Sequence, residues 1–166
     1  GMSTFMSYYI LSSVAMAGRT KDALQMMRDY YGGMLERGAT TFWEDFDLSW
    51  LEGSGRIDEF PKKGQKDLHG DFGAYCYKGF RHSLCHGWSG GPVPFLMHYV
   101  LGIREAAAGC KKMLFAPDLC GLKWARGTYP VPQGNVEISL TETRSGVKAE
   151  INAPAGIEIV RRKVRQ

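Results

Sequence analysis

The chain has 166 residues, of which 44% are hydrophobic and 12% aromatic, and its formal net charge is +4. This length and composition are typical of one or two folded domains and exclude a disordered or low-complexity chain. The basic run at 161–165 has no interleaved aromatic residues, so we expect a solvated strand edge and no nucleic-acid partner.

Neither targeting segments nor metal-ligand clusters stand out in the sequence. The first residues lack the basic start and apolar run of a signal peptide, and no apolar stretch is long enough to span a membrane. We therefore expect a soluble chain with no membrane partner and leave its localisation unknown. The spacing of the four cysteines predicts no disulfide framework: Cys76, Cys85, Cys110 and Cys120. His82 and His86 are four positions apart, but no cysteine pair answers them, so we expect no metal and no cofactor.

Two helices are predicted at the start of the chain. Apolar residues recur at helical spacing from residue 5 to about 17, and again from about 21 to 36. Gly18 is suited to end the first helix and Thr20 to cap the second. Because the connection at 19–21 is so short, we expect the two helices to form an antiparallel hairpin.

Residues 38–91 are predicted to be mostly irregular. A loop of this length is unusual in a compact domain unless it is functional or belongs to a larger fold. We expect a short helix near 44–50 and the greatest mobility between 52 and 71. A third helix is predicted from Pro92, which suits a first helical turn, to about 102–104. Its apolar face would contain Phe95, Leu96, Tyr99, Val100 and Ile103.

After about residue 107 the apolar pattern changes to the two-residue period of strands, which predicts a small antiparallel β-sandwich. The expected strands are 112–116, 121–126, 135–141, 147–152 and 156–163, separated by glycine-containing turns. The plain interpretation of this sheet is a module that adds stability. A carbohydrate-binding role would need exposed planar aromatic rings, for which only Trp124 and Tyr129 are candidates.

The segment 38–47 combines three carboxylates with three large aromatic side chains and is soon followed by Trp50. Such a combination suits a sugar site, because rings stack on the C–H faces of a pyranose and carboxylates move protons at the anomeric centre. It is also compatible with an ordinary loop whose aromatic side chains belong to the core and whose acids face solvent. Composition alone leaves both interpretations open.

Two short motifs carry a family resemblance: GATTFWE at 38–44 and SLCHGW at 83–88. Together they resemble the bacterial α-L-rhamnosidases, whose catalytic domain is an (α/α)6 barrel of the six-hairpin type. The resemblance covers essentially the whole chain but only the C-terminal part of such an enzyme. It implies an α+β fold, with part of the (α/α)6 barrel at 1–106 and an antiparallel β-sandwich at 107–166. The chain departs from the family pattern in having Gly87 directly after the histidine.

By this resemblance Glu44 is the general base of an inverting glycosidase that removes terminal α-L-rhamnosyl groups. Trp43, Trp50, His86 and Trp88 are the expected substrate-binding residues, and a rhamnose-containing glycan is the expected partner. An inverting enzyme also needs a general acid, which the resemblance places in an earlier loop of the barrel. This chain offers no equivalent, so we expect it to be inactive alone. The parent enzyme would be cytoplasmic or periplasmic.

Two other functions stay open at this point. The chain could be a non-catalytic carbohydrate-binding or interaction module derived from such an enzyme, or part of a six-hairpin glycosidase for another sugar. Helical faces left bare by missing hairpins would favour a homo-oligomer.

Overall fold

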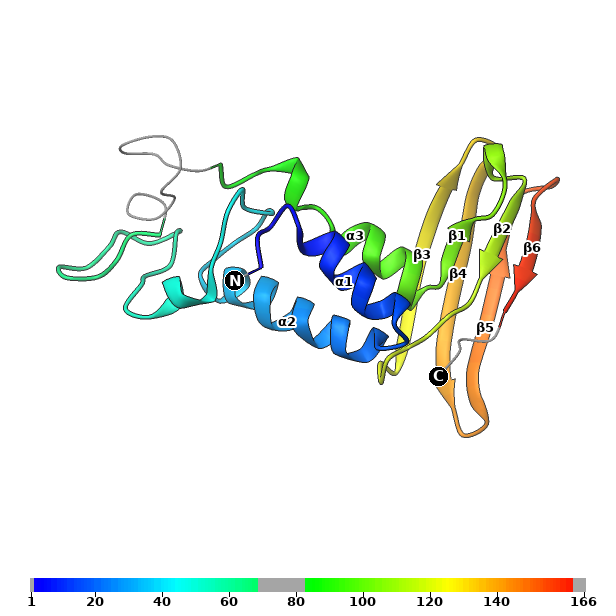
Figure 1. Cartoon of the computed structure of the whole chain (residues 1–166), viewed down its shortest axis with the longest axis horizontal. Helices are drawn as coiled ribbons and strands as arrows, with labels where there is room; N and C mark the ends of the chain where they lie inside the picture. Colours follow the sequence, from blue (N-terminus) through cyan, green and yellow to red (C-terminus); the bar gives the residue numbers. More distant parts are fainter. Residues whose placement is uncertain (1, 69–82, 163–166) are drawn as a thin grey trace. The chain divides into compact units, whose positions relative to one another are not determined.

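The computed structural model describes residues 2–68 and 83–162. The elements follow one another as helices in the first part of the chain and strands in the second (Figure 1). The chain divides into two compact units. One consists of Gly1–Ser13 with Ala23–Pro92, and the other of Val14–Asp22 with Val93–Gln166. The predicted α+β class is therefore confirmed, and each unit has its own group of buried side chains.

The two predicted N-terminal helices are present as α1, Ser7–Met16, and α2, Thr20–Glu36. They run in opposite directions (Figure 1), and the hydroxyl groups of Ser7 and Tyr31 are 2.6 Å apart across the pair. Buried positions of α2 recur every three or four residues, as an amphipathic helix requires: Ala23, Leu24, Met27, Tyr30, Tyr31 and Met34. No helix among the described residues is long and apolar enough to cross a membrane.

A glycine inside α2 makes room for the loop that follows the helix. A Cβ atom on Gly33 would come within 3.0 Å of the Phe46 ring and 3.1 Å of the Leu51 side chain. Glycine costs a helix roughly 1 kcal/mol relative to alanine. At Gly33 the absence of a side chain lets segment 46–51 pack closely on the helix, which offsets this cost. Tyr9 on α1 and Leu35 on α2 are exposed, so self-association through helical faces stays a prediction.

The long connection between α2 and the next helix is mostly irregular in its described parts, as predicted. Its described parts include the short 3-10 helices η1 at Leu48–Leu51 and η2 at Gly87–Ser89. Asp47 caps η1, because its carboxylate accepts a hydrogen bond of 2.9 Å from the Ser49 N–H. Of the segment predicted to be most mobile, residues 69–71 lie outside the described residues, and so do His69, Cys76 and His82.

The third predicted helix is shorter than expected. α3 spans Pro92–Phe95 and continues as one π-helical turn, η3, at Leu96–Val100. Residues Ile103–Glu105 form strand β1 instead of the last helical turn, so the placement of Ile103 on the helix was wrong. The helix ends because Gly102 adopts a φ of +73°, a left-handed conformation that glycine tolerates without strain.

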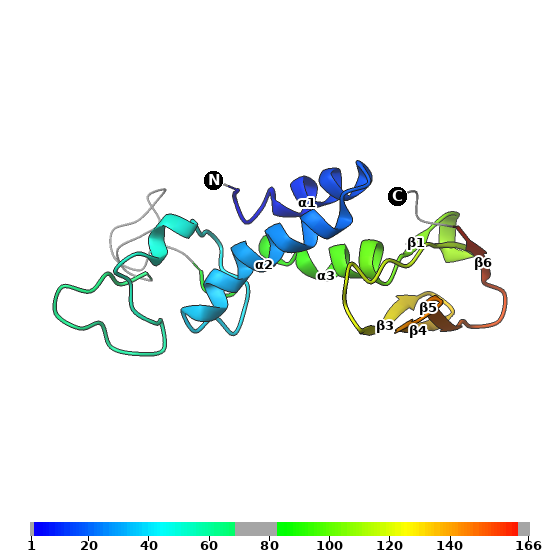
Figure 2. The same ribbon diagram turned by 90° about the horizontal axis from the view of Figure 1, so that it is seen from below.

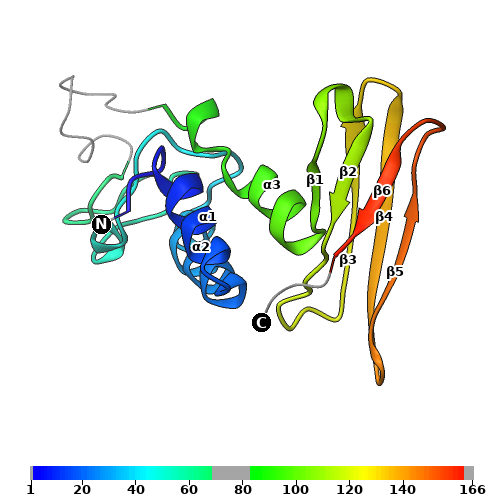
Figure 3. The ribbon, with the colours of Figure 1, turned by 45° about the vertical axis from the view of Figure 1, so that its right-hand side comes forward.

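In residues 2–68 and 83–162, six strands form two three-stranded sheets. Figures 2 and 3 show these strands in the second part of the chain. One sheet has the order β1, β2 (Lys112–Phe115) and β6 (Glu158–Arg161). The other has the order β3 (Trp124–Val131), β4 (Gly134–Thr143) and β5 (Gly146–Asn152). Strand β2 pairs with β6 in parallel, so the prediction of a purely antiparallel arrangement was wrong for this pair. β2 and β6 are not joined by a short turn: strands β3, β4 and β5 of the other sheet lie between them in the chain, and such a long connection allows parallel pairing.

The core of the second unit is formed by side chains from both sheets. Alternate residues of β4 are buried, namely Val136, Ile138 and Leu140, while Glu137 between them is exposed. They join the other buried members of the same cluster: Leu101, Ile103, Met113, Phe115 and Leu119. The alternation therefore assigns one face of the β3–β4–β5 sheet to the core and leaves a polar face outside.

Candidate functional site

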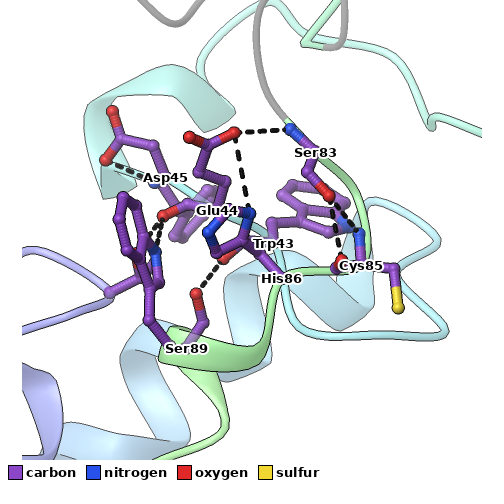
Figure 4. Close-up of polar contacts among 10 residues, drawn as sticks. Trp43, Glu44, Asp45, Ser83, Cys85, His86 and Ser89 are labelled. Atoms are coloured by element: carbon purple, nitrogen blue, oxygen red, sulfur yellow. Dashed lines mark hydrogen bonds and ion pairs between the residues drawn. The ribbon is translucent and has the colours of Figure 1, made fainter.

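The two sequence motifs lie against each other in the first unit (Figure 4). The backbone N–H of Glu44 donates to the Ser83 carbonyl, and the N–H of His86 donates to the Phe42 carbonyl, each over 2.8 Å. The Thr41 hydroxyl also donates to a carbonyl of the second motif, that of Leu84. Segments 41–44 and 83–86 therefore form one structural unit, although about forty residues separate them in the chain.

Within the described part of the chain, hydrogen bonds anchor the Glu44 carboxylate at one of its two oxygens. Its Oε2 accepts a 2.7 Å hydrogen bond from the Ser83 N–H (Figure 4). The same oxygen is 3.8 Å from Nδ1 of His86, which is too long for a hydrogen bond but close enough for an ion pair with a protonated imidazole. Among the described residues, no hydrogen-bond donor contacts Oε1. The Ser83 N–H therefore positions one oxygen, and the Glu44 side chain as a whole is 31% exposed.

The backbone around Glu44 is held from several directions. The Glu44 carbonyl accepts a 2.8 Å hydrogen bond from the Trp88 indole N–H and another from the Thr4 hydroxyl. The preceding carbonyl, that of Trp43, accepts a hydrogen bond from the buried Ser89 hydroxyl. Each buried carbonyl that finds a donor avoids the cost of desolvation, so these contacts fix the direction in which the Glu44 side chain leaves the backbone.

A buried tyrosine connects this site to both long helices. The Tyr31 hydroxyl on α2 donates to the Ser89 carbonyl over 3.1 Å and is 2.6 Å from the Ser7 hydroxyl on α1. The Ser7 hydroxyl in turn donates to the Thr4 carbonyl. Burial raises the pKa of Tyr31. The phenol therefore remains neutral at physiological pH and keeps its donor.

The candidate substrate-binding aromatic residues differ in their access to a ligand. Trp43 is 1% exposed and packs on Phe46, with ring centroids 5.8 Å apart, so in this structure it supports Glu44 from within the core. Trp50 belongs to η1 and also packs on Phe46, with ring centroids 6.1 Å apart. Trp88 is 49% exposed, and its ring centroid lies 4.2 Å from that of His86. Glu44, His86 and Trp88 are thus brought together.

The neighbouring acids are engaged by the backbone. Asp45 accepts a 2.9 Å hydrogen bond from the N–H of Phe46. Asp47 is the η1 cap, and hydrogen bonds from Ser49 lower the pKa of its carboxyl. A general acid needs a raised pKa so that it is protonated at neutral pH. Asp47 is therefore unsuited to that role.

Some contributors to the site had no clear signal in the sequence. Ser83 was seen only as the first letter of a motif, although its N–H holds Glu44. Thr4 precedes Glu44 by 40 positions, and no local pattern connects the two. Within residues 2–68 and 83–162 no group of three or more His, Cys, Asp or Glu side chains is arranged to hold a metal ion. His82, four positions before His86, lies outside the described residues.

Comparisons of sequence and of structure both find similarity to α-L-rhamnosidases. Residues 102–160 match the family described as the bacterial alpha-L-rhamnosidase C-terminal domain. An alpha-L-rhamnosidase of Alteromonas sp. (strain LOR) is 26% identical over 128 residues, which cover 74% of this chain and 11% of that protein. The expected resemblance to the C-terminal portion of bacterial α-L-rhamnosidases is thereby confirmed.

Solved structures extend the similarity over nearly the whole chain. A GH78 family rhamnosidase of Bacillus sp. GL1 is 31% identical with a TM-score of 0.73, over 97% of this chain and 15% of that one. An α-L-rhamnosidase of Dictyoglomus thermophilum (23% identity, TM-score 0.66) and one of Streptomyces avermitilis (18%, 0.62) share the fold over 92% of this chain. The aligned part is 15% and 13% of those chains. This chain therefore corresponds to a small part of each relative.

Proposed function

We propose that this chain contributes the base-bearing, C-terminal part of an inverting α-L-rhamnosidase, with Glu44 as the general base. The observation that carries the proposal is the Glu44 carboxylate itself. Its Oε2 is fixed by the Ser83 N–H and faces His86, which packs against Trp88, while Oε1 has no hydrogen-bond donor among the described residues. A base must present an available lone pair in a defined direction, and this arrangement meets both needs.

In the proposed reaction Glu44 takes a proton from a water molecule that attacks the anomeric carbon of a terminal rhamnosyl group. A second carboxyl group, protonated and roughly 6.5–9.5 Å away, would protonate the leaving oxygen. Asp45 and Asp47 are bound to backbone N–H groups, so neither is offered as this acid. The acid would come from a part of the enzyme beyond this chain, and the chain alone would not hydrolyse rhamnosides.

His86 and Trp88 are the proposed sugar contacts. Because Nδ1 of His86 faces Glu44, its Nε2 is left on the far side of the ring for a sugar hydroxyl. The half-exposed Trp88 ring would form a wall of the same pocket. Trp43 supports the site by packing beneath Glu44, and Trp50 would shape a neighbouring subsite. In this proposal residues 1–106 complete the catalytic barrel and residues 107–166 form the domain that follows it.

A chimeric enzyme tests the base. This chain would replace the corresponding segment of the Bacillus sp. GL1 rhamnosidase, and hydrolysis of an aryl α-L-rhamnoside would be measured. General base catalysis contributes about 10²–10⁴-fold, so Glu44→Ala should lower kcat by that factor. Asp45→Asn is the matched control, since its carboxyl is engaged with the adjacent N–H, and it should change kcat little.

Azide provides a readout that a purely structural role of Glu44 would not move. As a strong nucleophile it needs no base, so it should restore turnover by the Glu44→Ala chimera and yield a rhamnosyl azide of inverted configuration. An active chimera whose kcat does not depend on Glu44 would refute the proposal. If the isolated chain binds L-rhamnose through His86 and Trp88 while the chimera has no turnover, the non-catalytic binding module becomes the better description.

A further inference from the structure

The outer face of the β3–β4–β5 sheet carries a polar groove that the proposed catalytic role does not use. The groove has a volume of about 490 Å³. Strand register places its outward side chains in two rows across the sheet. Six of these residues line the groove: Arg126, Ser139 and Glu150 in one row, and Thr128, Glu137 and Asn152 in the next. The outer face of the sheet also includes the adjoining row of Trp124, Thr141 and Lys148.

The charges on this face balance. Arg126 and Lys148 are positive, while Glu137 and Glu150 are negative, and Lys148 is paired with Glu150 at 2.8 Å. A face with no net charge has no electrostatic preference for an anionic or a cationic partner. It nevertheless presents donors and acceptors side by side, together with the amide of Asn152. Such a surface is complementary to a neutral ligand that has many hydroxyl groups.

The indole ring of Trp124 adjoins these rows. Trp124 lies two residues before Arg126 on β3, so it is on the same face, where its cross-strand partners are Thr141 and Lys148. It is 63% exposed. The other aromatic candidate, Tyr129, has the opposite parity, and its hydroxyl donates to Glu105 of the other sheet. An exposed indole beside a polar groove gives an apolar plane and hydrogen-bonding groups within reach of one ligand.

We propose that the outer face of the β3–β4–β5 sheet is a second carbohydrate-binding surface, which takes a neutral oligosaccharide chain. Trp124 stacks on the C–H face of one sugar ring, and the two polar rows hydrogen-bond the hydroxyls of the adjoining units. The choice of rhamnose as the sugar rests on the proposed function. The preference for a neutral, polyhydroxylated chain rests on the face itself.

Affinity electrophoresis of the purified chain tests this surface with three soluble polymers: a neutral rhamnan, dextran and polygalacturonate. We expect retardation by the rhamnan. Trp124→Ala should weaken binding about tenfold, equivalent to ~1.4 kcal/mol. Asn152→Ala, on the same face, should weaken it several-fold. Val147→Ala is the matched control, because this partly exposed apolar side chain on β5 has the opposite parity, and it should bind normally.

The outcomes separate this surface from the catalytic proposal. Trp124→Ala should weaken rhamnan retardation of the chain and leave turnover of the small aryl rhamnoside by the chimera unchanged. Retardation that is equal for Trp124→Ala and the parent chain would overturn the proposal, provided that thermal unfolding shows both to be folded. Absence of binding to both neutral polymers, or a preference for polygalacturonate, would also overturn it. A folded chain bound by dextran but not by rhamnan would retain the surface and reject rhamnose as its sugar.

Discussion

Replacement of Ser89 by alanine probes how strongly the backbone beneath Glu44 is held. Ser89 is fully buried, and its hydroxyl donates to the carbonyl of Trp43, the residue before Glu44. Alanine removes this donor with almost no change in shape. Loss of a hydrogen bond to a buried carbonyl costs about 1–3 kcal/mol, so Ser89→Ala should lower the free energy of unfolding by that amount.

Ser13→Ala is the matched control for this substitution. Its hydroxyl also donates to a backbone carbonyl, that of Tyr9, over 2.7 Å, but the residue is exposed on α1. Water can replace the lost donor there, and alanine is favoured in helices by roughly 0.5 kcal/mol or less. Ser13→Ala should therefore be neutral or slightly stabilising.

Urea denaturation followed by circular dichroism would compare the three proteins, with thermal unfolding in support. For a chain of this size a loss of 1 kcal/mol lowers Tm by about 2–4 °C. Hydrogen exchange at the His86 amide gives a local readout, because this N–H donates to the Phe42 carbonyl and should exchange faster when the site loosens. If Ser89→Ala proves no more destabilising than Ser13→Ala, the reasoning about buried carbonyls at this site is refuted.

Two further predictions concern the second unit. Gly102→Ala should cost more than 3 kcal/mol or prevent folding, because a Cβ atom there would lie 2.2 Å from the Ala116 carbonyl oxygen, whereas Gly109→Ala, with a similar positive φ and open space, should cost about 1–2 kcal/mol. Equal urea midpoints for the two variants would contradict this. The hydrogen bond from the Tyr129 hydroxyl lowers the pKa of the Glu105 carboxyl. This hydrogen bond therefore stabilises the folded state above the unfolded pKa of Glu105, and the stabilisation is lost as pH falls through the folded pKa. Tyr129→Phe should destabilise by about 0.5–1 kcal/mol at pH 7, a value reduced for exposure. The difference from the parent should begin to shrink as pH falls below the unfolded pKa of about 4.3 and should disappear once pH is below the lowered folded pKa. A difference that is independent of pH would exclude the ionised Glu105 as its source.

The elements that could be predicted are those with a complete local pattern. α2 has apolar residues at helical spacing along its whole length, and β4 and β5 alternate between apolar and polar residues over most of theirs. Strand β1 was missed because Ile103 continues the apolar spacing of the preceding helix, and only the left-handed Gly102 separates the two. The parallel pairing of β2 with β6 depends on contacts distant in sequence, which a local pattern does not contain.

The site was predictable to a similar extent. The proximity of GATTFWE and SLCHGW was expected from the resemblance, and the backbone hydrogen bonds between them agree with it. The burial of Trp43 could not be read from the sequence, because a tryptophan beside carboxylates suits both a sugar platform and a core. The donors at the Glu44 carbonyl come from distant segments, Thr4 and Trp88, and their meeting depends on tertiary structure.

The parallel β2–β6 pair has a consequence for the order of assembly. Strands β3, β4 and β5 are neighbours in sequence and can pair through short turns, which keeps the entropy of loop closure low. β6 reaches β2 only across that entire meander, so it adds contacts of high contact order, which form slowly. Until then the backbone groups along one side of β2 have no partner strand, and such an open edge can recruit a strand from another molecule. Aggregation during refolding should therefore originate at this edge of the β1–β2–β6 sheet.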